Sequence, residues 1–192
     1  MRLFLIRHAP IEAAYRGRIV GRLDVAAELP AAAAVGAMPW GPEARWLVSP
    51  ARRARETAGW LGATRWVEEA DLWEQSHGDW EGRTWADVLA SDPEAAAYLE
   101  AFDRRRPPGG EHLGDVRRRV TRAIARATAA FPAEDLVVVC HAGPIRCLVA
   151  SALGVRTRRA AFLDVEPLSL STLTATPGGY RLSALNQPYG SW

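Results

Sequence analysis

Two short apolar segments, each followed by a histidine, place the strongest constraint on how this chain can fold. Leu3–Ile6 and Leu136–Cys140 are continuous apolar runs without alternation, the pattern of central strands that are covered on both faces. His8 follows the first run after one arginine, and His141 follows the second run directly. Because ligand sites in open α/β sheets gather beyond the carboxyl ends of the strands, we expect both histidines to face one pocket.

The rest of the chain alternates between strand and helix patterns. Arg45–Val48 predicts another short strand, and Ser49 and Pro50 are suited to cap and open a helix that runs to about Leu61. Further helices are predicted over residues 85–90, 93–102, 113–130 and 143–153, and a β-hairpin within 168–185. These patterns predict an α/β fold, a three-layer α/β/α sandwich whose central sheet is mostly parallel, with an antiparallel edge from the tail.

Composition limits the classes of protein that the chain can belong to. Its 192 residues fit a single domain, and a formal net charge of +2 does not indicate a nucleic-acid or membrane partner. The apolar start is too short for a signal peptide, and no segment has the roughly 20 apolar residues of a membrane helix. The arginine runs 104–106 and 117–119 lie among acidic residues and are expected on solvated faces. With Cys140 and Cys147 in apolar context, we expect a cytoplasmic protein with reduced thiols.

Each histidine taken alone is more often a structural residue than a catalytic one. Two histidines in equivalent positions, with arginines beside them, favour the catalytic interpretation. The helices predicted after Ser49 and Gly143 would also point their amino ends toward the same region. Since helix amino ends carry free N–H groups and a partial positive charge, the pattern favours a phosphate ligand.

Four segments, taken in order, resemble the histidine phosphatase superfamily, which includes the cofactor-dependent phosphoglycerate mutases. Residues 5–9 read Leu-Ile-Arg-His-Ala, and residues 139–146 read Val-Cys-His-Ala-Gly-Pro-Ile-Arg. Residues 49–58 match the family's Ser-Pro helix, and residues 72–82 match its Leu-x-Glu…Gly-x-Trp-Glu-Gly loop. Residues 21–24 and 108–111 extend the resemblance over most of the chain.

The resemblance implies a phosphoglycerate mutase-like fold and a role for each matching residue. His8 would be the nucleophile, Arg7 and Arg53 would hold the phosphoryl oxygens, and His141 would donate to the same oxygens. Glu74 would act as general acid and base, and the family pattern favours it over the nearby Glu81. No metal and no cofactor would be needed, because these residues supply the charge. The chain would be one domain, residues 1–192, with a helical insertion at about 71–110 covering the active site.

Several positions depart from the family pattern. Ala9 replaces a glycine, and Ala14 stands where many members carry an asparagine that contacts the phosphate. Arg16 or Arg18 could take over that contact. His112 replaces a common serine, and we expect it, like His77, to cap a helix or face solvent, although His77 is close enough to Glu74 to modulate it.

The resemblance is closest to α-ribazole phosphatases of cobalamin assembly, which implies a phosphomonoesterase acting through a phosphohistidine on a small phosphate ester. A broad-specificity phosphatase, a phosphoglycerate mutase-like enzyme and a catalytically silent phosphate-binding module are the alternatives. The tryptophans 73, 80 and 85 are either core residues or an aromatic wall of the site. Either state, monomer or homodimer, is compatible with the sequence. The possible substrate-binding residues are Arg16, Arg18, Arg22, Trp80 and Trp85.

Overall fold

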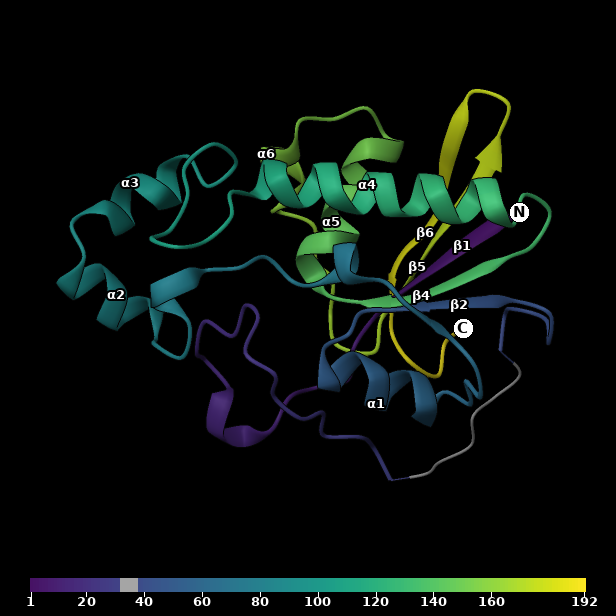
Figure 1. The fold of residues 1–192 in the computed structure, drawn as a ribbon, viewed down its shortest axis with the longest axis horizontal. Helices are drawn as coiled ribbons and strands as arrows, with labels where there is room; N and C mark the ends of the chain where they lie inside the picture. Colours follow the sequence, from purple (N-terminus) through teal and green to yellow (C-terminus); the bar gives the residue numbers. More distant parts are fainter. Residues whose placement is uncertain (32–37) are drawn as a thin grey trace.

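The protein is described by a computed structural model over residues 1–31 and 38–192 (Figure 1). Six strands form one sheet in the order β3-β2-β4-β1-β5-β6. The strands are β1 (Arg2–Arg7), β2 (Arg45–Val48), β3 (Val67–Glu68), β4 (Leu136–Cys140), β5 (Leu170–Thr176) and β6 (Gly179–Gln187). The helices are α1 (Arg52–Trp60), α2 (Trp85–Ser91), α3 (Glu94–Glu100), α4 (Leu113–Ala130), α5 (Ala142–Ala152) and α6 (Thr157–Ala160), with 3-10 turns η1 (Ala13–Tyr15), η2 (Ala70–Leu72) and η3 (Gly78–Trp80).

The two apolar runs are neighbouring parallel strands, as predicted. In β1 and β4, Leu3 lies opposite Leu136 and Arg7 lies opposite Cys140. The residues that follow, His8 and His141, therefore leave the sheet at the same edge. The sequence prediction that both histidines share one end of a sheet is confirmed by this register.

The sheet is mostly parallel with an antiparallel edge, as the sequence predicts. Strands β3, β2, β4 and β1 run parallel, whereas β5 is antiparallel to both β1 and β6. Helices α4 and α5 lie on one side of the sheet and α1 lies on the other (Figure 1). The apolar side chains form one core cluster beneath α4 and α5 and a second beneath α1, which together give the predicted three layers.

The predicted start of α1 is wrong. The helix begins at Arg52, after Ala51, and no side chain caps it. Ser49 lies at the end of β2, where its Oγ is 2.8 Å from Nε2 of His141. The Ser-Pro pair resembles a helix start, but in this fold the serine hydroxyl, at the end of β2, is hydrogen-bonded to His141, at the end of β4.

Residues 71–110 hold α2 and α3, which lie at one end of the molecule, beyond the edge of the sheet (Figure 1). Trp80 is the centre of a small separate core with Ile19, Val88, Ala95 and Tyr98. It is 1% exposed, and its indole N–H donates to Asp92 at 2.7 Å. This segment therefore packs around a small apolar cluster to which the N-terminal loop contributes Ile19.

Two further predictions concern single features. Cys140 and Cys147 are buried free thiols, as expected from their apolar context. Within the two described ranges, no helix combines the length and apolar character that crossing a membrane requires.

Candidate active site

His8 is buried at the carboxyl end of β1 and is 6% exposed. Its Nδ1 lies 2.6 Å from the carbonyl oxygen of Ala9. Because a carbonyl oxygen only accepts, Nδ1 must carry the proton, which leaves the lone pair on Nε2. Burial, and then the positive charges of Arg53 and Arg7, hold the pKa of His8 well below its ordinary value of 6.5. The imidazole is therefore neutral at neutral pH.

His141 packs against His8 from the neighbouring strand. The two ring centroids are 5.1 Å apart, and the Trp73 indole stacks parallel to His141 at 6.5 Å. Nε2 of His141 is paired with Ser49, whereas Nδ1 is buried and has no hydrogen-bond partner among the described residues. Burial also lowers the pKa of His141 well below 6.5, with the charge of Arg53 as the next cause.

Two arginines bring positive charge to the same edge. Arg53, on α1, is 2% exposed and donates to the carbonyl oxygens of Leu23 and Gly21 at 2.7 and 2.8 Å. Arg7, the last residue of β1, donates to the carbonyl oxygen of Val165 at 2.6 Å. The pKa of each guanidinium is lowered, chiefly by burial. Backbone carbonyls thus orient both groups without neutralising them.

Glu74 reaches the amino end of α5. One carboxylate oxygen accepts from the Gly143 N–H at 3.3 Å, and the other accepts from the Gln75 N–H at 2.9 Å. Gly143 leaves room for this approach, because a Cβ built on it would lie 2.3 Å from Oε1 of Glu74. By contrast, Oε1 of Glu81 accepts from the backbone N–H groups of Arg22 and His77 and ties the loop together.

A cavity of about 540 Å³ opens at this edge and falls within the size range of small-molecule sites. Among the predicted residues, those on its wall are Arg7, His8, Arg16, Arg18, Arg53, Glu74, His77 and Trp85. The apolar part of the wall comes from Pro10, Ile11, Tyr15, Ile19, Val20 and Pro167. The structure therefore brings together residues from distant parts of the sequence around one opening.

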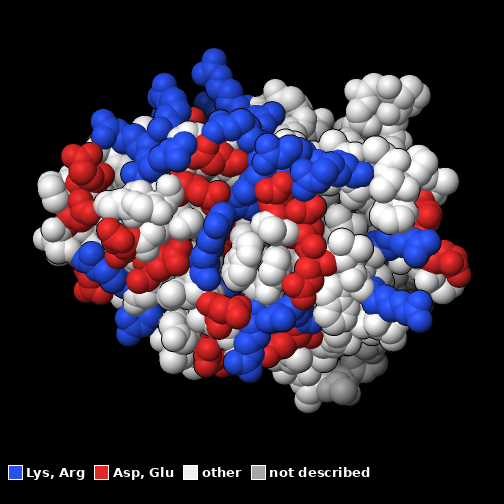
Figure 2. All heavy atoms as spheres, in the orientation of Figure 1, with Lys and Arg blue, Asp and Glu red and all other residues white. Residues whose placement is uncertain are grey.

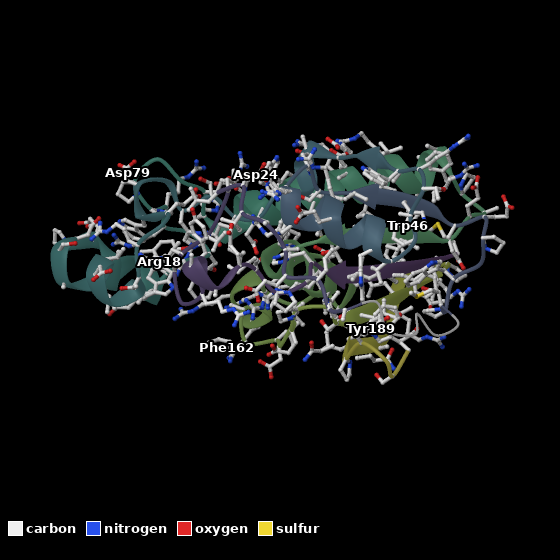
Figure 3. The ribbon with its side chains drawn as sticks, turned by 90° about the horizontal axis from the view of Figure 1, so that it is seen from below. Arg18, Asp24, Trp46, Asp79, Phe162 and Tyr189 are labelled. Carbon is white, nitrogen blue, oxygen red and sulfur yellow. The ribbon has the colours of Figure 1, made fainter. Side chains whose placement is uncertain are left out.

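Two predicted substrate-binding residues lie away from this wall. Trp80 is enclosed by the small core that it forms with Ile19, α2 and α3, so it is a core residue and its ring cannot stack on a ligand. Arg22 pairs with the Glu111 carboxylate at 3.2 Å instead of lining the cavity. Arg18 lies toward the end that carries α2 and α3, far from Trp46 (Figure 3). Its guanidinium donates to the carbonyl oxygens of Ala14 and Gly82 at 3.2 and 2.9 Å.

The two remaining histidines differ in their roles. His112 caps α4, because its Nδ1 accepts from the Asp115 N–H at 3.1 Å, as predicted. The His77 side chain caps no helix, and the residue is half-buried. It lines the cavity edge-on to Trp85, and its Nδ1 is buried without a hydrogen-bond partner in the described part of the chain. Burial lowers the pKa of His77.

Arg119 is a functional candidate that the sequence analysis placed wrongly on a solvated face. It is 7% exposed and donates to the backbone of the Glu74 segment. A signal was present, because Arg119 falls three residues after Val116 and four before Ala123, both on the buried face of α4. On the face that Figure 2 shows, arginines and acidic residues are intermixed, with a group of arginines along the upper edge.

A second cavity, of about 590 Å³, lies at the other end of the molecule around Trp40, Trp46 and Trp66. Figure 3 shows Trp46 at that end. Glu43 is the one carboxylate among its lining residues, and no histidine lines it. Its larger size therefore does not make it the better candidate for catalysis.

The fold and the edge site define an α/β protein with Arg7, His8 and Arg53 on the wall of one cavity. His141 packs against His8 but is fully buried and does not itself line the cavity, so the expectation that both histidines face one pocket holds for His8 alone. The sequence profile of the histidine phosphatase superfamily (branch 1) matches residues 3–188. The chain therefore belongs to the histidine phosphatase superfamily, as its sequence motifs indicate.

Individual relatives match over nearly the whole chain. The adenosylcobalamin/alpha-ribazole phosphatase of Salmonella typhimurium is 30% identical over 97% of this chain and 96% of its own length. The bifunctional protein Rv2228c of Mycobacterium tuberculosis is 33% identical over 97% of this chain, which spans only about half (54%) of that relative's length. The crystal structure of a mycobacterial glucosyl-3-phosphoglycerate phosphatase superposes with a TM-score of 0.82 at 26% identity, covering 97% of this chain and 98% of that one.

Proposed function

We propose that this protein is a phosphomonoesterase that works through a phosphohistidine intermediate on His8. The observation that carries the proposal is the state of His8, which is a neutral imidazole with its lone pair on Nε2, in the same cavity wall as Arg7 and Arg53. A neutral imidazole is a good nucleophile toward phosphorus. The arginines would offset the charge on the equatorial oxygens.

In the first step, Nε2 of His8 attacks the phosphorus, forming a P–N bond while the bond from phosphorus to the ester oxygen breaks. Glu74, in its protonated form, gives its proton to that leaving oxygen. Glu74 suits this role better than Glu81, because Glu74 lines the cavity whereas Glu81 does not and is used to hold its own loop. The alcohol then leaves the cavity.

In the second step, water attacks the phosphorus and the P–N bond breaks, releasing inorganic phosphate and neutral His8. Glu74, now a carboxylate, takes a proton from that water and is ready for another cycle. His141 supports both steps. The Ser49 hydroxyl can donate to its Nε2, which keeps the ring proton on Nδ1, the nitrogen left free to donate to a phosphoryl oxygen.

We assign the substrate to the class of α-ribazole 5′-phosphate, a phosphate ester whose leaving alcohol carries a planar aromatic base. The support is the phosphatase relative of that name and the Trp85 indole, which lines the cavity beside Tyr15 and Ile19. An indole offers a flat apolar surface on which a planar ring can stack. Residues 71–110, which supply Glu74 and Trp85, would cover the leaving group in this assignment.

The alternative is a sugar or glycerate ester, in line with the relative named glucosyl-3-phosphoglycerate phosphatase. Arg16 and Arg18 at the cavity favour it, because a guanidinium can hold a carboxylate. A panel of α-ribazole phosphate, 3-phosphoglycerate and sugar phosphates separates the two, and kcat/KM should be highest for α-ribazole phosphate. Trp85→Ala should reduce the difference in kcat/KM between α-ribazole phosphate and the other substrates. A higher kcat/KM for phosphoglycerates would contradict the aromatic substrate but not the phosphatase mechanism.

The phosphatase mechanism itself is tested with His8→Ala. This variant should fold and should release no phosphate above background, and labelled substrate should leave acid-labile phosphate on the wild type only. Arg53→Ala should lower kcat/KM strongly, while Arg52→Ala, its exposed neighbour on α1, is the matched control. Chelators should not change the rate, because arginine and histidine supply the charge. Turnover by His8→Ala, or a requirement of the wild type for added divalent ions, would contradict the mechanism. If the wild type bound phosphate but released none from any ester, the protein would be a catalytically silent binding module.

A further inference from the structure

Arg119 holds the segment that carries Glu74 through three main-chain carbonyl groups. Its guanidinium donates to the carbonyl oxygens of Asp71 and Trp73 at 2.6 Å each and to that of Glu74 at 3.0 Å. The same guanidinium is buried on α4, which is packed on the sheet. The catalytic segment is thus tied to a rigid helix by a side chain far away in sequence.

Glu111 completes this connection. Its two carboxylate oxygens accept from Nε and Nη2 of Arg119 at 3.0 and 3.1 Å, and one of them also accepts from the Ser76 N–H at 3.0 Å. Although partial burial opposes it, hydrogen bonds from Arg119 and Ser76 lower the pKa of Glu111, so the group is charged at neutral pH. The pair fastens the loop on both sides of Glu74.

Glu111 also reaches the phosphate side of the site. It pairs with Arg22 at 3.2 Å, and the loop around Arg22 supplies the carbonyl oxygens of Gly21 and Leu23 that orient Arg53. One partly buried ion pair, between Arg119 and Glu111, therefore contacts both the loop that orients Arg53 and the segment that carries Glu74.

We propose that Arg119 is a positioning residue for the general acid, acting with Glu111 to set the place of Glu74 against the phosphate pocket. The inference rests on the proposed function. Arginine suits the task because its five donors lie in one plane and can serve three carbonyls and a carboxylate together. A lysine ammonium has only three donors at a single point, so it keeps the charge but cannot hold the same geometry.

The test is the leaving-group dependence of kcat/KM in Arg119→Lys. If Glu74 is displaced by about 1 Å, alkyl phosphates should lose about 100-fold in kcat/KM. Aryl phosphates with acidic phenols need little protonation and should lose much less. If Arg119 only supported the fold, Arg119→Lys would lower kcat/KM equally for both substrate classes, or would lower the amount of folded enzyme. An equal loss for both classes, or no loss, would overturn the inference.

Arg126→Ala is the matched control. Arg126 lies on the same helix and contacts the same segment, but through exposed ion pairs with the Glu69 and Asp71 carboxylates. It should keep wild-type kcat/KM for both substrate classes. If Arg119→Lys does not fold, Glu111→Gln replaces it, since loss of that charge loosens the Arg119 guanidinium and should give the same contrast in weaker form.

Glu74→Gln separates this inference from the proposed function. If Glu74→Gln shows the alkyl-over-aryl contrast and Arg119→Lys does not, the positioning role fails and the general acid stands. If neither variant shows the contrast, the assignment of Glu74 as the acid fails as well. Neither outcome would contradict the proposal that His8 carries the phosphoryl group.

Discussion

Gly143→Ala should move the proposed general acid without unfolding the protein. A Cβ on residue 143 would lie 2.3 Å from Oε1 of Glu74, whereas nothing closer than ordinary van der Waals contact, about 3.4 Å, is comfortable. The clashing atom is the far end of a flexible side chain, so the carboxylate can retreat by about 1 Å at little energetic cost. The displaced oxygen would then miss the leaving group.

The expected effect on stability is small because opposing contributions nearly cancel. Alanine in place of a helical glycine stabilises by about 0.4–1 kcal/mol through the unfolded state. Pro144 follows and disfavours the helical conformation of an alanine before it, and the hydrogen bond from the Gly143 N–H to Glu74, worth about 1 kcal/mol, is weakened. Thermal unfolding should therefore shift by no more than about 4 °C.

The expected effect on catalysis is large. A displacement of about 1 Å at a reacting group costs on the order of 100-fold in rate. Rapid-quench measurement of phosphoenzyme formation should show this loss with an alkyl phosphate and a smaller loss with an aryl phosphate. Gly59→Ala is the control, because Gly59 lies on α1 with open space around it and should keep full activity. If Gly143→Ala formed the phosphoenzyme from alkyl phosphates at the wild-type rate, or lost much of its thermal stability, this account of the glycine would be refuted.

Three further predictions follow from the same geometry. Glu74→Gln should slow phosphorylation by alkyl phosphates by about 100-fold or more, and Glu81→Gln should not; the reverse result in rapid-quench assays would reassign the acid. The folded-state pKa values of His8 and His141 lie below 6.5, so below that pH the unfolded chain binds more protons than the folded protein. The free energy of unfolding should therefore fall as the pH drops below about 6.5, by up to about 1.4 kcal/mol per pH unit for each histidine. Urea titrations at pH 7 and pH 5 check this, and His8→Gln should flatten the dependence. Trp80→Ala should lower the free energy of unfolding by about 3–5 kcal/mol, measured by urea titration, because the ring lies in a core. In the folded fraction of this variant, the ratio of kcat/KM between aromatic phosphates and sugar phosphates should not change.

The sheet could be predicted because its central strands are unusually clear in the sequence. Leu3–Ile6 and Leu136–Cys140 are apolar on both faces, which leaves few arrangements for them, and their parallel register brings His8 and His141 to one edge. Helix α4 was predicted for a similar reason, since its apolar positions recur at helical spacing. These features depend on patterns within a single segment.

The errors concern residues whose role depends on a contact far away in sequence. Ser49 has the right identity and position to cap a helix, but a strand 92 residues away offers its hydroxyl a buried imidazole partner. Trp80 lies in the motif beside Glu74, yet the packing of α2 and α3 closes over it. Arg119 looks like one of three surface arginines until the Glu74 segment is placed against α4. For Ser49 and Trp80 no local pattern contains this information, whereas the spacing of Arg119 from Val116 and Ala123 on α4 was a local signal of its burial.

The distribution of the arginines gives the strongest physical argument for an anionic ligand. Surface arginines such as Arg2 and Arg45 pair with carboxylates at Asp135 and Glu134. The two most buried at the site, Arg7 and Arg53, are held instead by neutral carbonyl groups of the described chain. The Glu74 carboxylate lies near both guanidinium groups and offsets part of their charge, but neither group forms an ion pair within the described chain, so both keep donors for a further anion. A phosphoryl group carries negative charge and has several oxygens that the two guanidinium groups can bind, which fits the proposed attack by His8, whose pKa both arginines lower.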